Sequence, residues 1–189
     1  MFNYEQMRSI TIFIFILMSQ LIISQNEKPE KLYNKAYQFI TNGNYNESIE
    51  LLTKAIEIDS LGRCGTGING KAQNELGYAY MRIQNFKLGR KFFDESINLN
   101  PRNPDPRINK VASYILQSNI KKAKAELLIL IHEIPGYPLA HWQYGNLLEN
   151  EGKIKEALME YRKARAFNRK LNILPNNIVK EINQKLEEN

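Results

Sequence analysis

Residues 70–103 read GKAQNELGYAYMRIQNFKLGRKFFDESINLNPRN, and features of this stretch return along the chain every 34 residues. The recurring positions keep their size class: Gly77, Val111 and Gly145; Tyr80, Tyr114 and Leu148; Gly89, Ala123 and Ala157; Phe93, Leu127 and Tyr161. Small residues are needed where two helices approach closely, and large apolar residues are needed where the space between helices must be filled. The period therefore predicts an all-α stack of helical hairpins.

The period divides the chain into four units, which cover residues 29–62, 70–103, 104–137 and 138–171. Residues 63–69 are an insertion after the first unit. In the second unit we predict helices over about Lys71–Ile83 and Phe86–Leu99, separated by a short turn. After the last unit, Ile178, Val179, Ile182 and Leu186 share one helical face. Residues 172–189 are therefore predicted to form a C-terminal capping helix that covers the end of the stack.

The second unit carries Leu76-Gly77-x-x-Tyr80, then Gly89-x-x-x-Phe93, and it closes on Pro101. These offsets resemble the tetratricopeptide repeat. The third unit departs from the pattern, because Lys110 and Val111 stand where the second unit has its Leu-Gly pair, and the fourth has Arg169 in place of the closing proline. The resemblance implies a tetratricopeptide-type superhelix of four hairpins, and a non-enzymatic protein that binds other proteins.

The first 24 residues differ in composition from the rest. Ile10 to Ile23 carries no charge and is dominated by Ile, Phe, Leu and Met. At about 1.5 Å per residue this run is too short to cross a hydrocarbon core of roughly 30 Å, so it is typical of a secretory signal. We predict cleavage near Ser24, with a retained N-terminal membrane anchor as the alternative. The predicted location is outside the cytoplasm, in a bacterial periplasm or envelope.

Charge and cysteine content narrow the classes of partner. The formal net charge is +6, and the Lys and Arg residues alternate with Glu and Asn along the sequence. Nucleic-acid binding would require cations gathered on one face with aromatic residues between them, so it is not predicted. Cys64 is the only cysteine, which excludes an internal disulfide; we expect it to be a spectator in the 63–69 loop.

The resemblance places partner-binding positions on the first helix of each hairpin, along a concave groove. Carried onto this sequence, these positions are Tyr33, Tyr37, Asn74, Tyr78, Arg82, Ile108, Ala112, Ile115, Trp142, Asn146 and Glu149. Rings with amide neighbours suit a peptide or a partner helix. The alternative is a small ligand or an envelope glycan stacked on Tyr37, Tyr78 and Trp142. Some of these side chains could instead be covered by neighbouring helices, and a third option is a structural subunit that uses the convex face. A second copy of this chain stays open as the partner.

Other motifs do not lead to a site. One subset of the resembled family grips a C-terminal carboxylate with Lys and Asn in its first unit, and here those positions hold Tyr33 and Tyr37. Residues 65–70 match G-x-G-x-x-G, but they follow a predicted helix rather than a strand, so a flexible linker is expected instead of a dinucleotide site. His132 and His141 are the only histidines and lack a partner set typical of catalysis or metal binding. We expect no cofactor and no metal.

Overall fold

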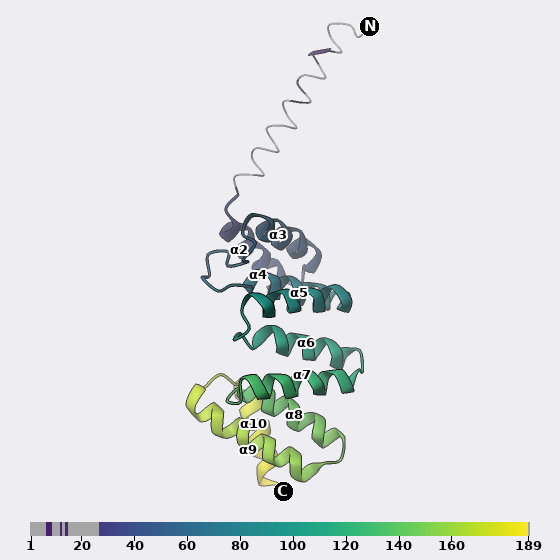
Figure 1. Ribbon diagram of the computed structural model, residues 1–189, viewed down its shortest axis with the longest axis vertical. Coiled ribbons are helices and arrows are strands. Elements are labelled where there is room, and N and C mark those ends of the chain that lie inside the picture. Colours follow the sequence, from purple (N-terminus) through teal and green to yellow (C-terminus); the bar gives the residue numbers. More distant parts are fainter. Residues whose placement is uncertain (1–6, 9–11, 13, 15–26, 189) are drawn as a thin grey trace.

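The computed structural model describes residues 7–8, 12, 14 and 27–188 (Figure 1). Its main elements are the helices α2 (Pro29–Thr41), α3 (Tyr45–Ile58), α4 (Lys71–Arg82), α5 (Phe86–Leu99), α6 (Asp105–Leu116), α7 (Ile120–Glu133), α8 (Pro138–Asn150), α9 (Ile154–Leu171) and α10 (Asn176–Glu187). The described residues contain no strand, which confirms the all-α class. Most of the predicted signal lies outside the described residues, so that interpretation stays a prediction.

Consecutive helices pair as hairpins, α2 with α3, α4 with α5, α6 with α7 and α8 with α9, and the hairpins stack along the long axis (Figure 1). The core is built between neighbours. One cluster of buried side chains joins α2, α3 and α4, a second joins α6, α7 and α8, and a third joins α8, α9 and α10. The predicted solenoid of four hairpins with a capping helix is confirmed.

The turn inside each hairpin contains a residue with the same backbone conformation. Gly43, Gln84, Ser118 and Gly152 all have positive φ, and each lies 14 residues after the first residue of its unit. Such a residue ends the preceding helix in the left-handed conformation. Asn85 then accepts a hydrogen bond from the Leu88 N–H at 3.3 Å and caps α5, and Asn119 does the same for α7. The hairpins therefore turn back at equivalent places.

The recurring glycines lie where the helices of a hairpin touch. A Cβ built on Gly77 would lie 2.7 Å from the Phe93 ring, and one built on Gly145 would lie 2.5 Å from the Tyr161 ring. Both rings are almost completely buried. The alternation of small and large residues in the sequence thus reflects the packing of the first helix of each hairpin (helix A) against the second (helix B).

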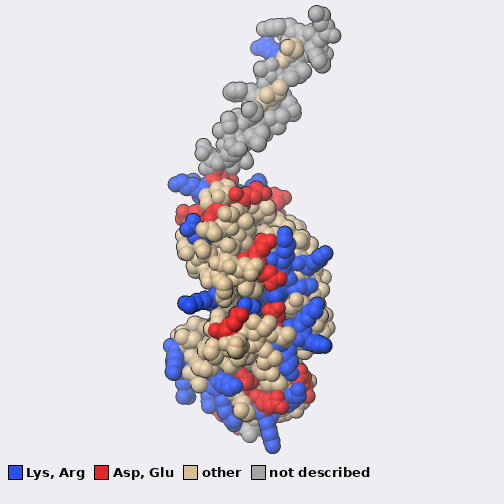
Figure 2. Space-filling view, viewed as in Figure 1, with Lys and Arg blue, Asp and Glu red and all other residues tan. Residues whose placement is uncertain are grey.

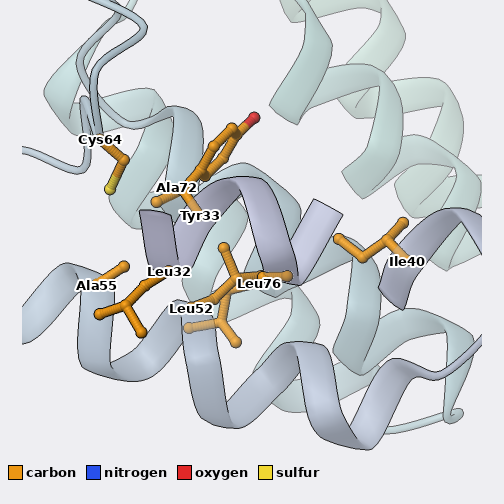
Figure 3. Packing of buried hydrophobic residues seen from close by; sticks show 9 residues of the cluster. Leu32, Tyr33, Ile40, Leu52, Ala55, Cys64, Ala72 and Leu76 are labelled. Atoms are coloured by element: carbon orange, nitrogen blue, oxygen red, sulfur yellow. The ribbon is translucent and has the colours of Figure 1, made fainter. Parts of the chain in front are cut away.

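The insertion, residues 63–69, is held against the first two hairpins. Asp59 accepts a hydrogen bond from the Cys64 N–H at 2.9 Å, and the residues flanking the insertion are joined by the bond from the Gly70 N–H to the Leu61 carbonyl at 2.7 Å. Cys64 is 1% exposed and belongs to the same cluster as Tyr33 and Leu32 (Figure 3). The loop thus adds a buried side chain to the core, whereas its flexibility and the spectator role of Cys64 stay predictions.

The C-terminal end of the stack differs from the other units because the fourth unit lacks the closing proline. With Arg169 in that position, α9 continues to Leu171 and is 18 residues long, compared with 14 for α5 and α7. Asn168 then accepts hydrogen bonds from the Ile173 and Leu174 N–H groups at 2.9 and 2.8 Å. This cap turns the chain so that α10 packs Ile178 and Ile182 against the last hairpin.

Candidate binding groove

A hollow of about 390 Å³ crosses the first helices of three successive hairpins. Its lining comes from α2, α4, α6 and the start of α8: Tyr37, Ile40, Thr41, Lys71, Asn74, Glu75, Tyr78, Asp105, Ile108, Asn109, Tyr137 and Leu139. The hollow exists because the helices that line it are the A helices of the stack, whose B helices lie on the other side. It is the candidate binding groove of this chain.

The polar side chains of the hollow orient one another. Asn109 Nδ2 donates to Asn74 Oδ1 at 3.0 Å and so links α6 to α4. This contact leaves Asn74 Nδ2 as a donor and Asn109 Oδ1 as an acceptor. Lys71 pairs with Glu75 at 3.0 Å, and although burial opposes it, this carboxylate raises the pKa of Lys71. The floor therefore offers a donor and an acceptor, the two groups that a peptide backbone can bond.

Tyrosine rings form the walls. Tyr37 is 48% exposed and stacks on Tyr33, with ring centroids 6.3 Å apart. The Tyr78 hydroxyl accepts a hydrogen bond from Arg82 at 2.7 Å, and the Arg82 guanidinium lies 4.8 Å from the centre of the Tyr45 ring. Tyr137 donates to Asp105 at 3.5 Å. These contacts restrict the rings, so less side-chain freedom is lost when a ligand packs on them.

The structure brings together four of the predicted groove residues, namely Tyr37, Asn74, Tyr78 and Ile108. Arg82 lies beyond Tyr78, at the end of α4. Ala112 and Ile115 lie further along α6 and do not line the hollow. Binding by any of these residues stays a prediction, but their placement on the A helices is as expected.

Three predicted residues are largely covered, and Asn74 at the floor of the hollow is 4% exposed. Tyr33 is 6% exposed in the buried cluster that also contains Cys64, Ala72 and Leu76, and burial raises its pKa well above the ordinary range. Ile108 is 8% exposed at the floor of the hollow, where it belongs to the α6–α8 cluster. The interpretation of Tyr33 as an accessible groove ring is therefore wrong, and Ile108 presents only an edge.

The fourth hairpin uses its predicted groove residues for contacts within the chain. Trp142 Nε1 donates to Glu181 Oε1 of α10 at 3.3 Å, and Glu149 pairs with Lys185 of the same helix. Asn146 accepts a hydrogen bond from the Tyr161 hydroxyl at 2.6 Å. The three side chains were predicted to face a partner; each is partly exposed and is engaged by α9 or α10, so partner binding at these residues stays a prediction. The accessible groove thus belongs to the first three hairpins.

Eight lining residues were missed by the sequence reasoning, among them Asp105, Asn109 and Tyr137. Asn109 follows Asn74 by 35 residues, one more than the period, so it falls outside the positions assigned by resemblance. Tyr137 lies in the connection between two units, directly before α8. Its aromatic character beside Pro138 was the available signal, but a connection has no assigned role in the repeat pattern.

Several buried charged groups outside the hollow form pairs with one another. Lys110 lies 2.6 Å from Glu126 and 2.8 Å from Asp94, and although burial opposes it, these carboxylates raise the pKa of Lys110. His141 contacts Glu160 and the Pro135 carbonyl oxygen, between α8 and α9. None of these groups lines the hollow, so they act as packing contacts between helices. Among the described residues no cluster of three or more His, Cys, Asp or Glu could hold a metal ion.

Residues 32–60 and 70–103 match the family model described as tetratricopeptide repeat. These two units are tetratricopeptide repeats. The second matched range is identical to the unit that the 34-residue period defines. A search among curated proteins gives no match.

Solved structures show the same fold. A crystal structure of MamA superimposes with a TM-score of 0.64 at 21% identity, covering 82% of this chain and 87% of that one. A tetratricopeptide repeat protein from Parabacteroides merdae superimposes with a TM-score of 0.60 at 17% identity, covering 85% of this chain and 63% of that one. The first repeat domain of Spaghetti (RPAP3), bound to an HSP90 peptide, has a TM-score of 0.55 at 18% identity, covering 66% of this chain and 94% of that one. The likeness confirms the tetratricopeptide-type superhelix.

Within the part of the chain that the structure describes, no helix combines the length and apolar character needed to span a bilayer.

Proposed function

We propose that this chain is a non-enzymatic scaffold that binds an extended segment of a partner protein in the groove of its first three hairpins. The observation that carries this function is the hollow that joins α2, α4 and α6, where the exposed Tyr37 ring and the partly buried Tyr78 ring stand beside the Asn74–Asn109 pair. Rings bury a large area with few torsions to immobilise, and the carboxamides can bond the backbone of the segment.

The solved complex of the RPAP3 repeat domain with an HSP90 peptide supports a peptide as the ligand of this fold. In our proposal the segment is internal rather than a chain end. The positions used to grip a terminal carboxylate hold Tyr33 and Tyr37, and Tyr33 is covered. The proposal also assigns the scaffold to a bacterial periplasm or envelope, on the basis of the signal-like residues 1–24.

A small ligand or glycan is the second candidate, favoured by the size of the hollow. About 390 Å³ falls within the range of roughly 300–1,000 Å³ that small-molecule sites occupy. The rings available to such a ligand are Tyr37, Tyr78 and Tyr137, because Trp142 is engaged with α10. This ligand would contact one or two rings, whereas a peptide would cross all three hairpins.

The test selects peptides from a displayed random library on the full chain and measures their affinity for groove variants. Tyr78→Ala and Asn109→Ala should each weaken the selected peptides by about tenfold, equivalent to about 1.4 kcal/mol. Leu128→Ala is the matched control, because Leu128 is 46% exposed on α7 and does not line the hollow. Equal affinity for the groove variants and the control would reject the groove as the peptide site. Failure to enrich any peptide would favour the small ligand.

A further inference from the structure

Two hairpin turns carry positive charge without any acidic residue. Residues 82–93 contain four cations and residues 115–125 contain three, and neither stretch includes Asp or Glu. The seven cations are Arg82, Lys87, Arg90, Lys91, Lys121, Lys122 and Lys124. We call these two stretches the basic turn edge.

Contacts between successive hairpins make this edge continuous. Arg90 of α5 donates to Gln117, at the end of α6, and its guanidinium lies 4.7 Å from the centre of the Tyr114 ring. Lys122 lies over the same ring at 5.7 Å. The hairpin turns lie along one side of the stack (Figure 1), and Lys and Arg side chains gather there over α5 to α7 (Figure 2).

Aliphatic side chains are exposed between these cations. Leu116 is 62% exposed, Ile83 39%, Ile120 38% and Ile115 37%. All four lie at the ends or beginnings of helices that meet at the turns. Lys124 pairs with Glu151 at 2.8 Å and Lys91 lies 3.6 Å from Glu95, so part of the positive charge is neutralised within the chain. Exposed branched side chains beside the remaining cations form a surface that suits an anionic and partly apolar partner.

We propose that the basic turn edge binds the anionic surface of a lipid bilayer. The ammonium and guanidinium groups meet lipid phosphates, and the four aliphatic side chains enter the boundary between head groups and acyl chains. Binding of this kind needs no membrane-spanning segment.

The same contacts disfavour nucleic acid. Arg82 lies over the Tyr45 ring, and both Arg90 and Lys122 lie over Tyr114. Rings covered by cations do not offer the faces on which bases stack. An acidic protein segment would neutralise the cations but would leave Leu116 and its aliphatic neighbours in water. A lipid surface satisfies both features of the edge.

Membrane binding at this edge would leave the groove accessible. The hollow is lined by α4 between Lys71 and Tyr78, by the beginning of α6 at Asp105, and by the second half of α2. The edge is formed by the ends of α4 and α6, at Arg82 and Leu116. A scaffold attached to a bilayer in this way could still bind its partner segment, and the two activities can be tested separately.

The first experiment reports on the edge itself. The full chain with Cys64→Ala receives an environment-sensitive nitrobenzoxadiazole label at Leu116→Cys, and a matched protein carries it at Asn98→Cys, near the other end of α5. Vesicles containing phosphatidylglycerol should shift the label at position 116 to shorter wavelength, whereas pure phosphatidylcholine vesicles and the label at position 98 should give no shift. Attachment through residues 1–24 alone would not produce this pattern, and an unshifted label at position 116 on anionic vesicles would overturn the proposal.

The second experiment tests the charge. Two triple variants lose the same net charge: Lys87→Gln, Lys121→Gln and Lys122→Gln on the edge, or Arg162→Gln, Arg169→Gln and Lys170→Gln on α9. The edge variant should need about tenfold more anionic lipid, or more, for a half-maximal shift at position 116, while the α9 variant should stay within about twofold of the parent. Equal responses of the two variants would overturn the proposal. So would a label that responds to polyglutamate or single-stranded DNA and not to vesicles.

Discussion

His141 of α8 and Glu160 of α9 form a buried pair, with Nδ1 2.6 Å from Oε2, at the unit positions that Leu32 and Leu51 hold in the first hairpin. In both units the two residues are 19 apart in sequence. The third unit places Arg107 and Glu126 at these positions, 3.9 Å apart, and the second unit places Gln73 and Phe92 there. One location between helices A and B is thus apolar at one end of the stack and ionic at the other.

This equivalence predicts a strong coupling between His141 and Glu160. Each single change to Leu leaves a polar partner buried without its main contact and should cost about 2–4 kcal/mol in the free energy of unfolding. The double change to Leu copies the first hairpin, so it should come within about 1 kcal/mol of the parent or exceed it. Urea unfolding of the four proteins measures the cycle.

Additive costs in that cycle would contradict the prediction, because they would show that the pair contributes nothing beyond its separate residues. Leu32→Ala provides a comparison at the apolar end of the stack. It should cost about 2–5 kcal/mol through loss of buried area and the cavity left behind.

The pair also predicts loss of stability in acid. Burial alone would raise the pKa of Glu160, but hydrogen bonds from His141 and Lys163 lower it below the ordinary value of 4.5. A carboxylate with a lowered pKa in the folded state stabilises the fold above the ordinary pKa, and this contribution disappears as the pH falls through the lowered value. The free energy of unfolding of the parent should therefore fall more steeply below about pH 4.5 than that of Glu160→Gln. Parallel pH profiles of the two proteins would reject this role.

The hairpin turns predict a way to stabilise the chain. Gln84 and Ser118 hold φ values of 63° and 56°, where the equivalent residues of the first and last hairpins are glycines. Gln84→Gly and Ser118→Gly should each add about 0.5–1 kcal/mol, since glycine adopts the left-handed conformation without a Cβ penalty. Gly152→Ala is the reciprocal control. Nothing lies within 4 Å of its added Cβ, so its expected loss of about 1 kcal/mol would be due to backbone strain alone. Melting curves showing that the glycine variants are less stable would refute this account.

Burial of Cys64 predicts that its thiol reacts slowly with disulfide reagents. Burial and the nearby Asp59 carboxylate raise the thiol pKa to about 11, and the residue is 1% exposed. At pH 8 only about 0.1% of such a thiol is ionised, so a disulfide reagent should react with the native chain far more slowly than with the chain in urea. Leu116→Cys in the Cys64→Ala background supplies an exposed thiol as the control. Comparable reaction rates for the two thiols in the native chains would show that Cys64 is not buried.

The sequence predicted the parts of the structure that depend on helix geometry. The 34-residue period located close helix contacts such as Gly145 against Tyr161, because helix packing determines where large and small residues must recur. It could not predict that Cys64 joins Tyr33 in one buried cluster, since the path of a non-periodic loop depends on tertiary contacts. Nor could it place α10 on Trp142. The cations of the turn edge fall in two separate stretches of the sequence, and only the stacking of successive turns brings Arg90 beside Tyr114 and Lys122.

The contact between Gly145 and Tyr161 gives a prediction that separates close packing from mere helix propensity. A Cβ on Gly145 would lie 2.5 Å from the Tyr161 ring, which is 1% exposed and fixed by hydrogen bonds from its hydroxyl to Asn146 and Glu149 at 2.6 and 2.9 Å. The ring cannot move aside, so Gly145→Leu should lower the free energy of unfolding by about 1–3 kcal/mol although leucine favours helix. Gly136→Ala is the control, because the nearest atom to its added Cβ is 3.8 Å away. If Gly145→Leu left the melting temperature unchanged, helices A and B could not be packed as closely as the structure shows.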